Sequence, residues 1–107
     1  CEVDLKHLSS LLEIGFSIVD NFPLKAIEIF NFINSKEETP HEVLDFAIEI
    51  SITLAKIDID EAIKFINKID ALYYKEKSFR LILKEVEDIE VIEKIIRDII
   101  FLWKYKE

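Results

Sequence analysis

The chain has very little of the residues that turn, cross-link or interrupt a polypeptide. Its 107 residues include one glycine, two prolines, one cysteine and no methionine. A single cysteine cannot form an internal disulfide, so a disulfide-stabilised secreted scaffold is excluded, and so is a zinc site built from several cysteines. One glycine is too few for a β-rich fold, which needs turn residues at about every tenth position. The composition therefore points away from small cross-linked domains and from β-sandwiches.

Half of the residues are apolar, a third are charged, and the net charge is −8. A chain of this length forms one domain, and this apolar content supplies a core, so disorder is excluded. Isoleucine outnumbers leucine by 20 to 11, and lysine outnumbers arginine by 12 to 2. This balance favours a heat-loving source, although an AT-rich genome produces the same bias.

No segment resembles a targeting or membrane-spanning sequence. Residues 1–4 lack the basic and apolar regions of a signal peptide. The most apolar stretch, residues 91–103, contains four charged side chains and is shorter than the ~20 apolar residues of a membrane span. We therefore expect no membrane association and a cytoplasmic location, which also suits the lone cysteine. The alternative that Cys1 begins a mature lipoprotein stays open.

Apolar residues recur at helical spacing along almost the whole chain, which predicts an all-α fold. Four signals for the start of a helix divide the chain. Thr39 is a candidate N-cap with Pro40 at the first helical position and Glu42 reaching back to the cap, and Asp58 is an acidic cap. Further starts are expected at Asn21-Phe22-Pro23 and at Glu87-Asp88. The predicted helices cover residues 4–19, 23–34, 40–56, 59–69, 72–86 and 88–104, and short connections predict antiparallel neighbours.

An internal repeat makes the architecture more specific. Residues 54–63 align without a gap on residues 83–92, with apolar residues matched to apolar ones and Asp58 and Glu61 matched to Glu87 and Glu90. A second offset places residues 24–27 on 60–63. We therefore predict one helical-repeat domain over residues 1–107, with hairpins at about 4–34, 40–69 and 72–104 stacked as a short right-handed α-solenoid. The alternative is a six-helix bundle whose helices align by period alone.

The repeat carries a family resemblance. Ala26, followed four residues later by Phe30, looks like the second helix of a tetratricopeptide repeat, although the first-helix positions of that repeat are not matched. The chain is more similar to a looser family of helical repeats, related to tetratricopeptide and HEAT units, of archaeal and bacterial proteins. The matching positions are Leu54-Ala55, Asp58, Asp60, Ala62-Ile63, Ile66, Ile69, Tyr74-Lys75 and Phe79-Arg80. The resemblance implies a scaffold for protein contacts, without catalytic residues.

The sequence offers no pattern for catalysis. His7 and His41 each follow an acidic residue by three positions, like half of a di-iron motif, but the Pro40 break separates Glu38 from the helix of His41, so solvated or capping histidines are expected. No serine has a local histidine partner, and no glycine-rich loop could hold a phosphate. We expect no enzyme activity, no metal and no cofactor.

Charge argues against nucleic acid as a partner. Residues 1–53 carry ten acidic and three basic side chains, and an acidic surface repels phosphates. The fifth helix carries Lys77, Arg80 and Lys84 beside Tyr73 and Tyr74, a basic and aromatic patch. Because Glu87, Glu90 and Glu93 follow on the sixth helix, we expect an ion-pair network between these two helices instead.

The last helix is apolar on most of its circumference. Ile89, Ile92, Ile96, Ile99 and Trp103 form one stripe, and Val91, Ile95, Ile100, Phe101 and Leu102 cover much of the rest. A helix of this kind is normally buried, whereas a terminal solenoid helix normally turns a polar face outward. We therefore expect a cover: a second copy, another protein, or further repeats. The alternative is that the first helix folds over the last and closes the domain.

Three functions fit these features. The first is a protein-interaction scaffold that binds a partner or itself through the last helix. The expected contact residues are Ile100, Phe101, Trp103, Tyr73 and Tyr74. The second is a small-molecule-binding or enzymatic domain with an apolar pocket between hairpins, lined by Phe16, Phe30, Phe46 and Phe65. The third is a structural fragment of a longer repeat protein.

Overall fold

The computed structural model describes residues 5–34 and 40–106, with side chains described for residues 7–34 and 40–104. These parts are all-helical, which confirms the predicted fold class, and each of the six predicted segments contains one α-helix. In chain order the elements are α1 (Leu5–Ile18), α2 (Pro23–Ile33), α3 (His41–Ile57), α4 (Ile59–Asn67), α5 (Leu72–Ile82), the 3₁₀ turn η1 (Leu83–Glu85) and α6 (Ile89–Lys106).

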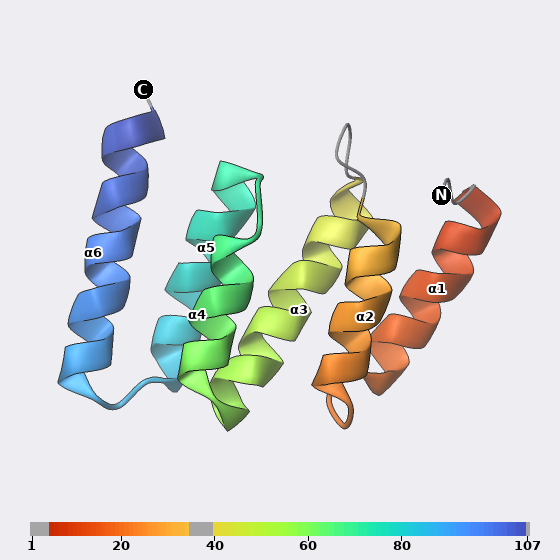
Figure 1. Ribbon diagram of the computed structural model, residues 1–107, viewed down its shortest axis with the longest axis horizontal. Helices are drawn as coiled ribbons and strands as arrows, with labels where there is room; N and C mark the ends of the chain where they lie inside the picture. The colour runs from red at the N-terminus through yellow and green to blue at the C-terminus, as the bar shows by residue number, and fades with distance from the viewer. Residues whose placement is uncertain (1–4, 35–39, 107) are drawn as a thin grey trace.

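The helices are arranged nearly in chain order along the longest axis of a flat molecule (Figure 1), whose extents are 42 × 35 × 16 Å. Within each predicted hairpin the two helices pack together, and α3 also packs against α1, α2 and α5. Helices α1 and α6 lie at opposite ends of the array (Figure 1). The alternative that the first helix folds over the last and closes the domain is therefore wrong. The right-handed solenoid path stays a prediction.

Helix α3 is the centre of the core. Ten of its 17 residues are buried, which is more than half of the helix. A surface helix buries only one face, so α3 is an interior helix. Phe46 and Ile50 are fully buried. Thr53 ties this helix to the α1–α2 turn, because its hydroxyl donates to Asp20 Oδ1 at 3.4 Å. The first two hairpins therefore share one continuous core.

The single glycine has a packing role. A Cβ built on Gly15 of α1 would lie 2.9 Å from Cε1 of Phe46 and closer still to Cζ. The Phe46 ring also contacts the ring of Phe16, with centroids 5.1 Å apart. Since the backbone of α1 approaches an aromatic ring of α3 directly, only glycine fits this contact without displacement.

The local start signals act largely as expected. Asp58 caps α4, with Oδ1 accepting from the backbone N–H of Asp60 at 3.1 Å and of Glu61 at 3.4 Å. Asp88 accepts from the backbone N–H of Glu90 at 2.9 Å at the start of α6. Pro23 occupies the first turn of α2.

The start of α3 differs from the prediction by one position. Pro40 is the N-cap, not the first helical residue, and its carbonyl accepts from the backbone N–H groups of Val43 and Leu44. Its backbone is extended, with ψ of 151°, so the helix begins at His41. The predicted cap Thr39 lies outside the described residues. The predicted fifth helix is also shorter, because its last turn tightens into η1.

Candidate functional site

Two exposed apolar surfaces stand out in the described part of the chain. The first, here called the outer stripe, lies on α6 and consists of Ile89, Ile92, Ile96, Ile100 and Trp103. The second is a groove between the start of α2 and the α3–α4 junction. Large apolar side chains that remain exposed at neighbouring positions mark sites for a protein or a ligand.

The outer stripe lies beside the face that α6 buries. Ile95 and Ile99 are buried against the core, and α6 makes most of its contacts with α5. At 100° per residue, the five stripe residues fall within about 80° of the helix circumference, in the sector next to the buried one. Ile89 is 63% exposed and Trp103 is 52% exposed, whereas Ile92 is half-buried. Ile99, which the sequence grouped with this stripe, instead belongs to the core.

A polar chain fixes the end of the outer stripe to α5. The indole Nε1 of Trp103 donates to Glu76 Oε2 at 2.8 Å, and Glu76 Oε1 accepts from Arg80 Nε at 3.5 Å. The exposed Tyr73 precedes Glu76 by one helical turn, so both lie on one side of α5. The stripe thus ends beside an aromatic side chain of the neighbouring helix.

The side chain of Tyr74 contacts α3 and is not part of the outer stripe. It is half-buried, and its hydroxyl lies 2.7 Å from Nδ1 of His41 at the start of α3. Desolvation, assisted by Asp45, Tyr73 and Glu42, raises the pKa of Tyr74 above its usual 10.0. The hydroxyl therefore stays protonated at neutral pH, and it donates to Nδ1 when that nitrogen is unprotonated. Tyr74 thus links α5 to α3.

The five contact residues expected from the sequence do not form one surface. Ile100 and Trp103 lie on the outer stripe, and Tyr73 lies beside its end. Phe101 is exposed but projects about 100° further around α6 from Ile100. Tyr74 is engaged with His41. The stripe also contains two strongly exposed residues that were not among the five, Ile89 and Ile96.

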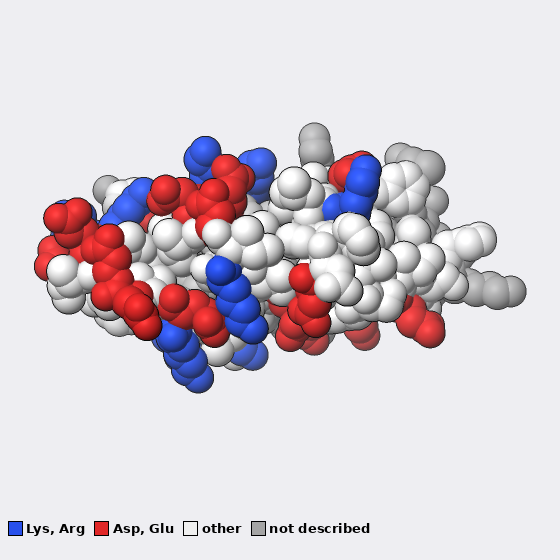
Figure 2. Space-filling view, turned by 90° about the horizontal axis from the view of Figure 1, so that it is seen from below, with Lys and Arg blue, Asp and Glu red and all other residues white. Residues whose placement is uncertain are grey.

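The four charged residues of α6 nearest the outer stripe change sign at Ile96. Glu90 and Glu93 precede Ile96, and Arg97 and Lys104 follow it; all four are exposed. Lys94 and Asp98, with the opposite order of charge, lie further around the helix from the stripe. Figure 2, seen from below, shows acidic side chains gathered at the left end of the molecule, where Figure 1 places the N-terminal end of α6.

The expected ion-pair network between the fifth and sixth helices is wrong. The ion pairs among the described residues are Lys25–Glu28, Lys64–Glu61 and Arg80–Glu76, each within one helix. Most charged side chains of α6 are exposed, and α5 and α6 are linked instead by the hydrogen bond between Trp103 and Glu76.

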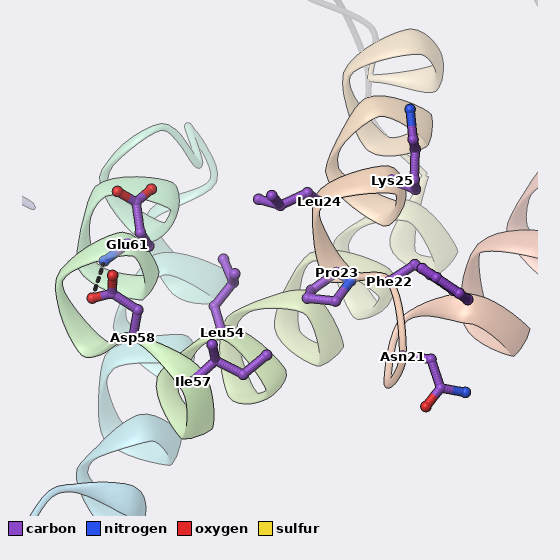
Figure 3. A pocket seen from close by; sticks show the side chains of 9 residues that line it. All are labelled: Asn21, Phe22, Pro23, Leu24, Lys25, Leu54, Ile57, Asp58 and Glu61. Atoms are coloured by element: carbon purple, nitrogen blue, oxygen red, sulfur yellow. Dashed lines mark hydrogen bonds between the residues drawn. The ribbon is translucent and has the colours of Figure 1, made fainter.

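The groove is a cavity of about 380 Å³ with an apolar floor. Leu54 is buried at its base, while Leu24 and Ile57, each 67% exposed, stand on either side of it. Figure 3 shows Leu24 of α2 reaching across the gap toward Leu54 and Ile57 of α3. Asp58 and Glu61 form the rim on the α4 side. The cavity can accept a small apolar group.

The aromatic residues expected to line a pocket belong mainly to the core instead. Phe30, Phe46 and Phe65 are buried, and the rings of Phe30 and Phe65 pack edge to face with centroids 5.3 Å apart. None of the four expected residues lines the groove. Sequence periodicity missed the groove because Leu24 and Ile57 stand at helix ends, where position on a helical face does not determine burial.

Among the described residues, no three or more histidine, cysteine, aspartate or glutamate side chains gather in a way that could hold a metal ion. In this same part of the chain, no helix is both long and apolar enough to cross a bilayer. Comparison of the chain with protein-family models, with curated proteins and with solved structures gave no match.

Proposed function

We propose that this chain is a protein-binding module of the tetratricopeptide- and HEAT-like helical-repeat class, without catalytic activity. The surface that binds the partner is the outer stripe of α6. The single observation that carries the proposal is the exposure of Ile89, Ile96, Ile100 and Trp103 on one side of a terminal helix. Contiguous apolar surface of this kind is costly in water and is typical of an interface.

The position of α6 and the fixed side chain of Trp103 support the proposal. Helix α6 lies at one end of the described array (Figure 1) and packs mainly against α5, so no other described helix covers the stripe. Trp103 is held by Glu76, and an aromatic side chain fixed before binding loses little conformational entropy in an interface. The acidic surface makes nucleic acid a poor partner, and we place the module in the cytoplasm.

Site-specific photocrosslinking in the source organism tests this function. A benzophenone amino acid at position 96 is expected to give covalent adducts with a protein, whereas the same group at Lys64, an exposed position on α4, is expected to give none. In the position-96 probe, a second change of Trp103→Lys, which retains a donor for Glu76, should reduce the adducts. Absence of adducts at position 96, or equal adducts at both positions, would contradict the proposal.

A second candidate function rests on the groove. Leu24 and Ile57 expose most of their surface around a floor formed by Leu54, which favours the binding of a small apolar molecule. Titration with hexanol, followed through the methyl NMR signals of these three residues, should shift all three together. Leu24→Asp should abolish the shifts of Leu54 and Ile57. Shifts that are equally large for the methyl groups of Leu72 on α5 would show nonspecific binding.

A further inference from the structure

We propose that the partner on the outer stripe is a second copy of this chain, packed with its α6 antiparallel to the first around a two-fold axis at Ile96. The inference rests on the proposed function, because it names the occupant of the same surface. Its basis is a symmetry in α6 that an interface with an unrelated protein does not require.

The apolar residues of the stripe are spaced symmetrically. Successive members are separated by three, four, four and three positions, with Ile96 at the centre. A two-fold axis through Ile96 therefore places Ile89 opposite Trp103 of the second copy and Ile92 opposite Ile100, while Ile96 meets its own equivalent. Such an isologous arrangement places apolar side chains opposite apolar side chains along the helix.

The charges follow the same symmetry. Glu90, Glu93, Arg97 and Lys104 fall within about 60° of the circumference, on the side of the stripe away from α5. In the antiparallel register, Glu93 lies about 3 Å along the helix axis from Arg97 of the second copy, and Glu90 lies about 3 Å from Lys104, at 1.5 Å per residue. The axis repeats each contact, so each of these four side chains meets one of opposite charge.

A parallel pairing loses this complementarity. It would set Glu90 and Glu93 level with their own equivalents, and Arg97 and Lys104 level with theirs, and like charges across an interface oppose association. Neither Glu93 nor Arg97 has an ion-pair partner within the described part of the chain. Both side chains are therefore available to a second copy, and their arrangement selects the antiparallel orientation.

The interface can extend beyond α6. Tyr73 of α5 is exposed next to the end of the stripe, where the second copy would place its Ile89. Helix α6 has 18 residues and is about 27 Å long, so two antiparallel copies can contact each other over several helical turns. No other helix of the described part of the chain lies on the far side of α6 (Figure 1).

Complementation between two charge-reversed variants tests the register. In sedimentation equilibrium at low salt, Glu93→Lys alone and Arg97→Glu alone are each expected to weaken self-association by at least about tenfold, because each creates two like-charge contacts. Mixed together, the two variants should associate as well as the wild type. In the mixed pair both intermolecular contacts again join opposite charges, whereas the contact between positions 93 and 97 within each helix stays repulsive.

Recovery in the mixture therefore distinguishes a contact between copies from an effect on helix stability. Failure of the mixture to associate better than either variant would overturn the proposed register. A wild-type chain that stays monomeric at several hundred micromolar would overturn the second copy as the partner.

A substitution at the axis provides the second test. Ile96→Asp places two carboxylates opposite each other and should weaken the dimer at least about thirtyfold, the scale of an interface hot spot. The matched control Ile57→Asp changes an equally apolar, exposed residue in the groove and should leave association unchanged. Equal effects of the two changes would overturn the proposal.

The photocrosslinking experiment distinguishes failure of the dimer from failure of the proposed protein-binding function. Adducts from position 96 that contain only a different protein would overturn the dimer while leaving the proposed function intact. Absence of any adduct would overturn both.

Discussion

At the scale of single residues, Ser78 is an uncompensated polar group in the core. It is fully buried on α5, and its hydroxyl has no hydrogen-bond partner among the residues that the structure describes, whereas the equally buried Ser51 donates to the carbonyl of Ala47 at 2.8 Å. An unsatisfied buried hydroxyl costs about 1 kcal/mol or more.

Ser78→Ala is accordingly expected to raise the free energy of unfolding, measured by urea denaturation, by about 1 kcal/mol. The comparison variant Ser51→Ala removes a hydroxyl that has a partner and should lower it slightly. If Ser78→Ala were as destabilising as Ser51→Ala, the hydroxyl of Ser78 would have a bonding role.

Replacing Gly15 with alanine is expected to have two opposing effects on the stability of the fold. Alanine favours a helix over glycine by about 1 kcal/mol, but the added Cβ would push into the buried ring of Phe46, and overpacking costs about 1–3 kcal/mol. Because this ring is rigid and enclosed, we expect the packing effect to be larger. Gly15→Ala should then lower the free energy of unfolding by about 1 kcal/mol in thermal or urea denaturation.

The two effects separate in a double-mutant cycle. In a Phe46→Leu background the aromatic ring is gone, and Gly15→Ala is expected to be neutral or stabilising there. The same loss in both backgrounds would show that the contact with Phe46 is not the cause.

At the scale of helices, the cap of α4 has a measurable role. Asp58 is the only side chain of the described residues that is shown capping this helix start, through two backbone N–H groups. Asp58→Ala should lower the free energy of unfolding by about 1 kcal/mol, and Asp58→Asn, which keeps the acceptor, should retain most of the stability. The control Asp60→Ala removes only a favourable charge near the helix start and should cost less. Equal losses at both positions would show a general charge effect.

Features that depend on contacts between nearby residues could be predicted from the sequence, whereas features that depend on packing between helices could not. Asp58 and Asp88 were identified because a cap acts on amides two or three residues away. The outward side of α6 could not be identified from the sequence. Ile99 and Ile100 are both isoleucine, and only packing of the helix against its neighbours makes Ile99 buried and Ile100 exposed. The groove depends on how far α2 stands from the α3–α4 junction, which no local pattern contains.

At the scale of the whole molecule, stability should vary along the array of helices. Helix α3 packs against four other helices, whereas α6 packs mainly against α5. In a structure whose contacts join near neighbours, the ends can open without the centre. We therefore expect native-state hydrogen exchange at low protein concentration to protect amides of α3 most and those of α6 least.

Two core substitutions give this gradient a sharper test. Ile95 of α6 and Ile50 of α3 are both fully buried, so replacing either with alanine removes a similar apolar group. Ile95→Ala should speed exchange mainly in α5 and α6, because the remaining helices keep their contacts. Ile50→Ala should speed exchange in every helix, because α3 holds the others together. If Ile95→Ala instead sped exchange equally everywhere, the molecule would unfold as one unit, and α6 would be coupled to the far end of the array despite its limited packing.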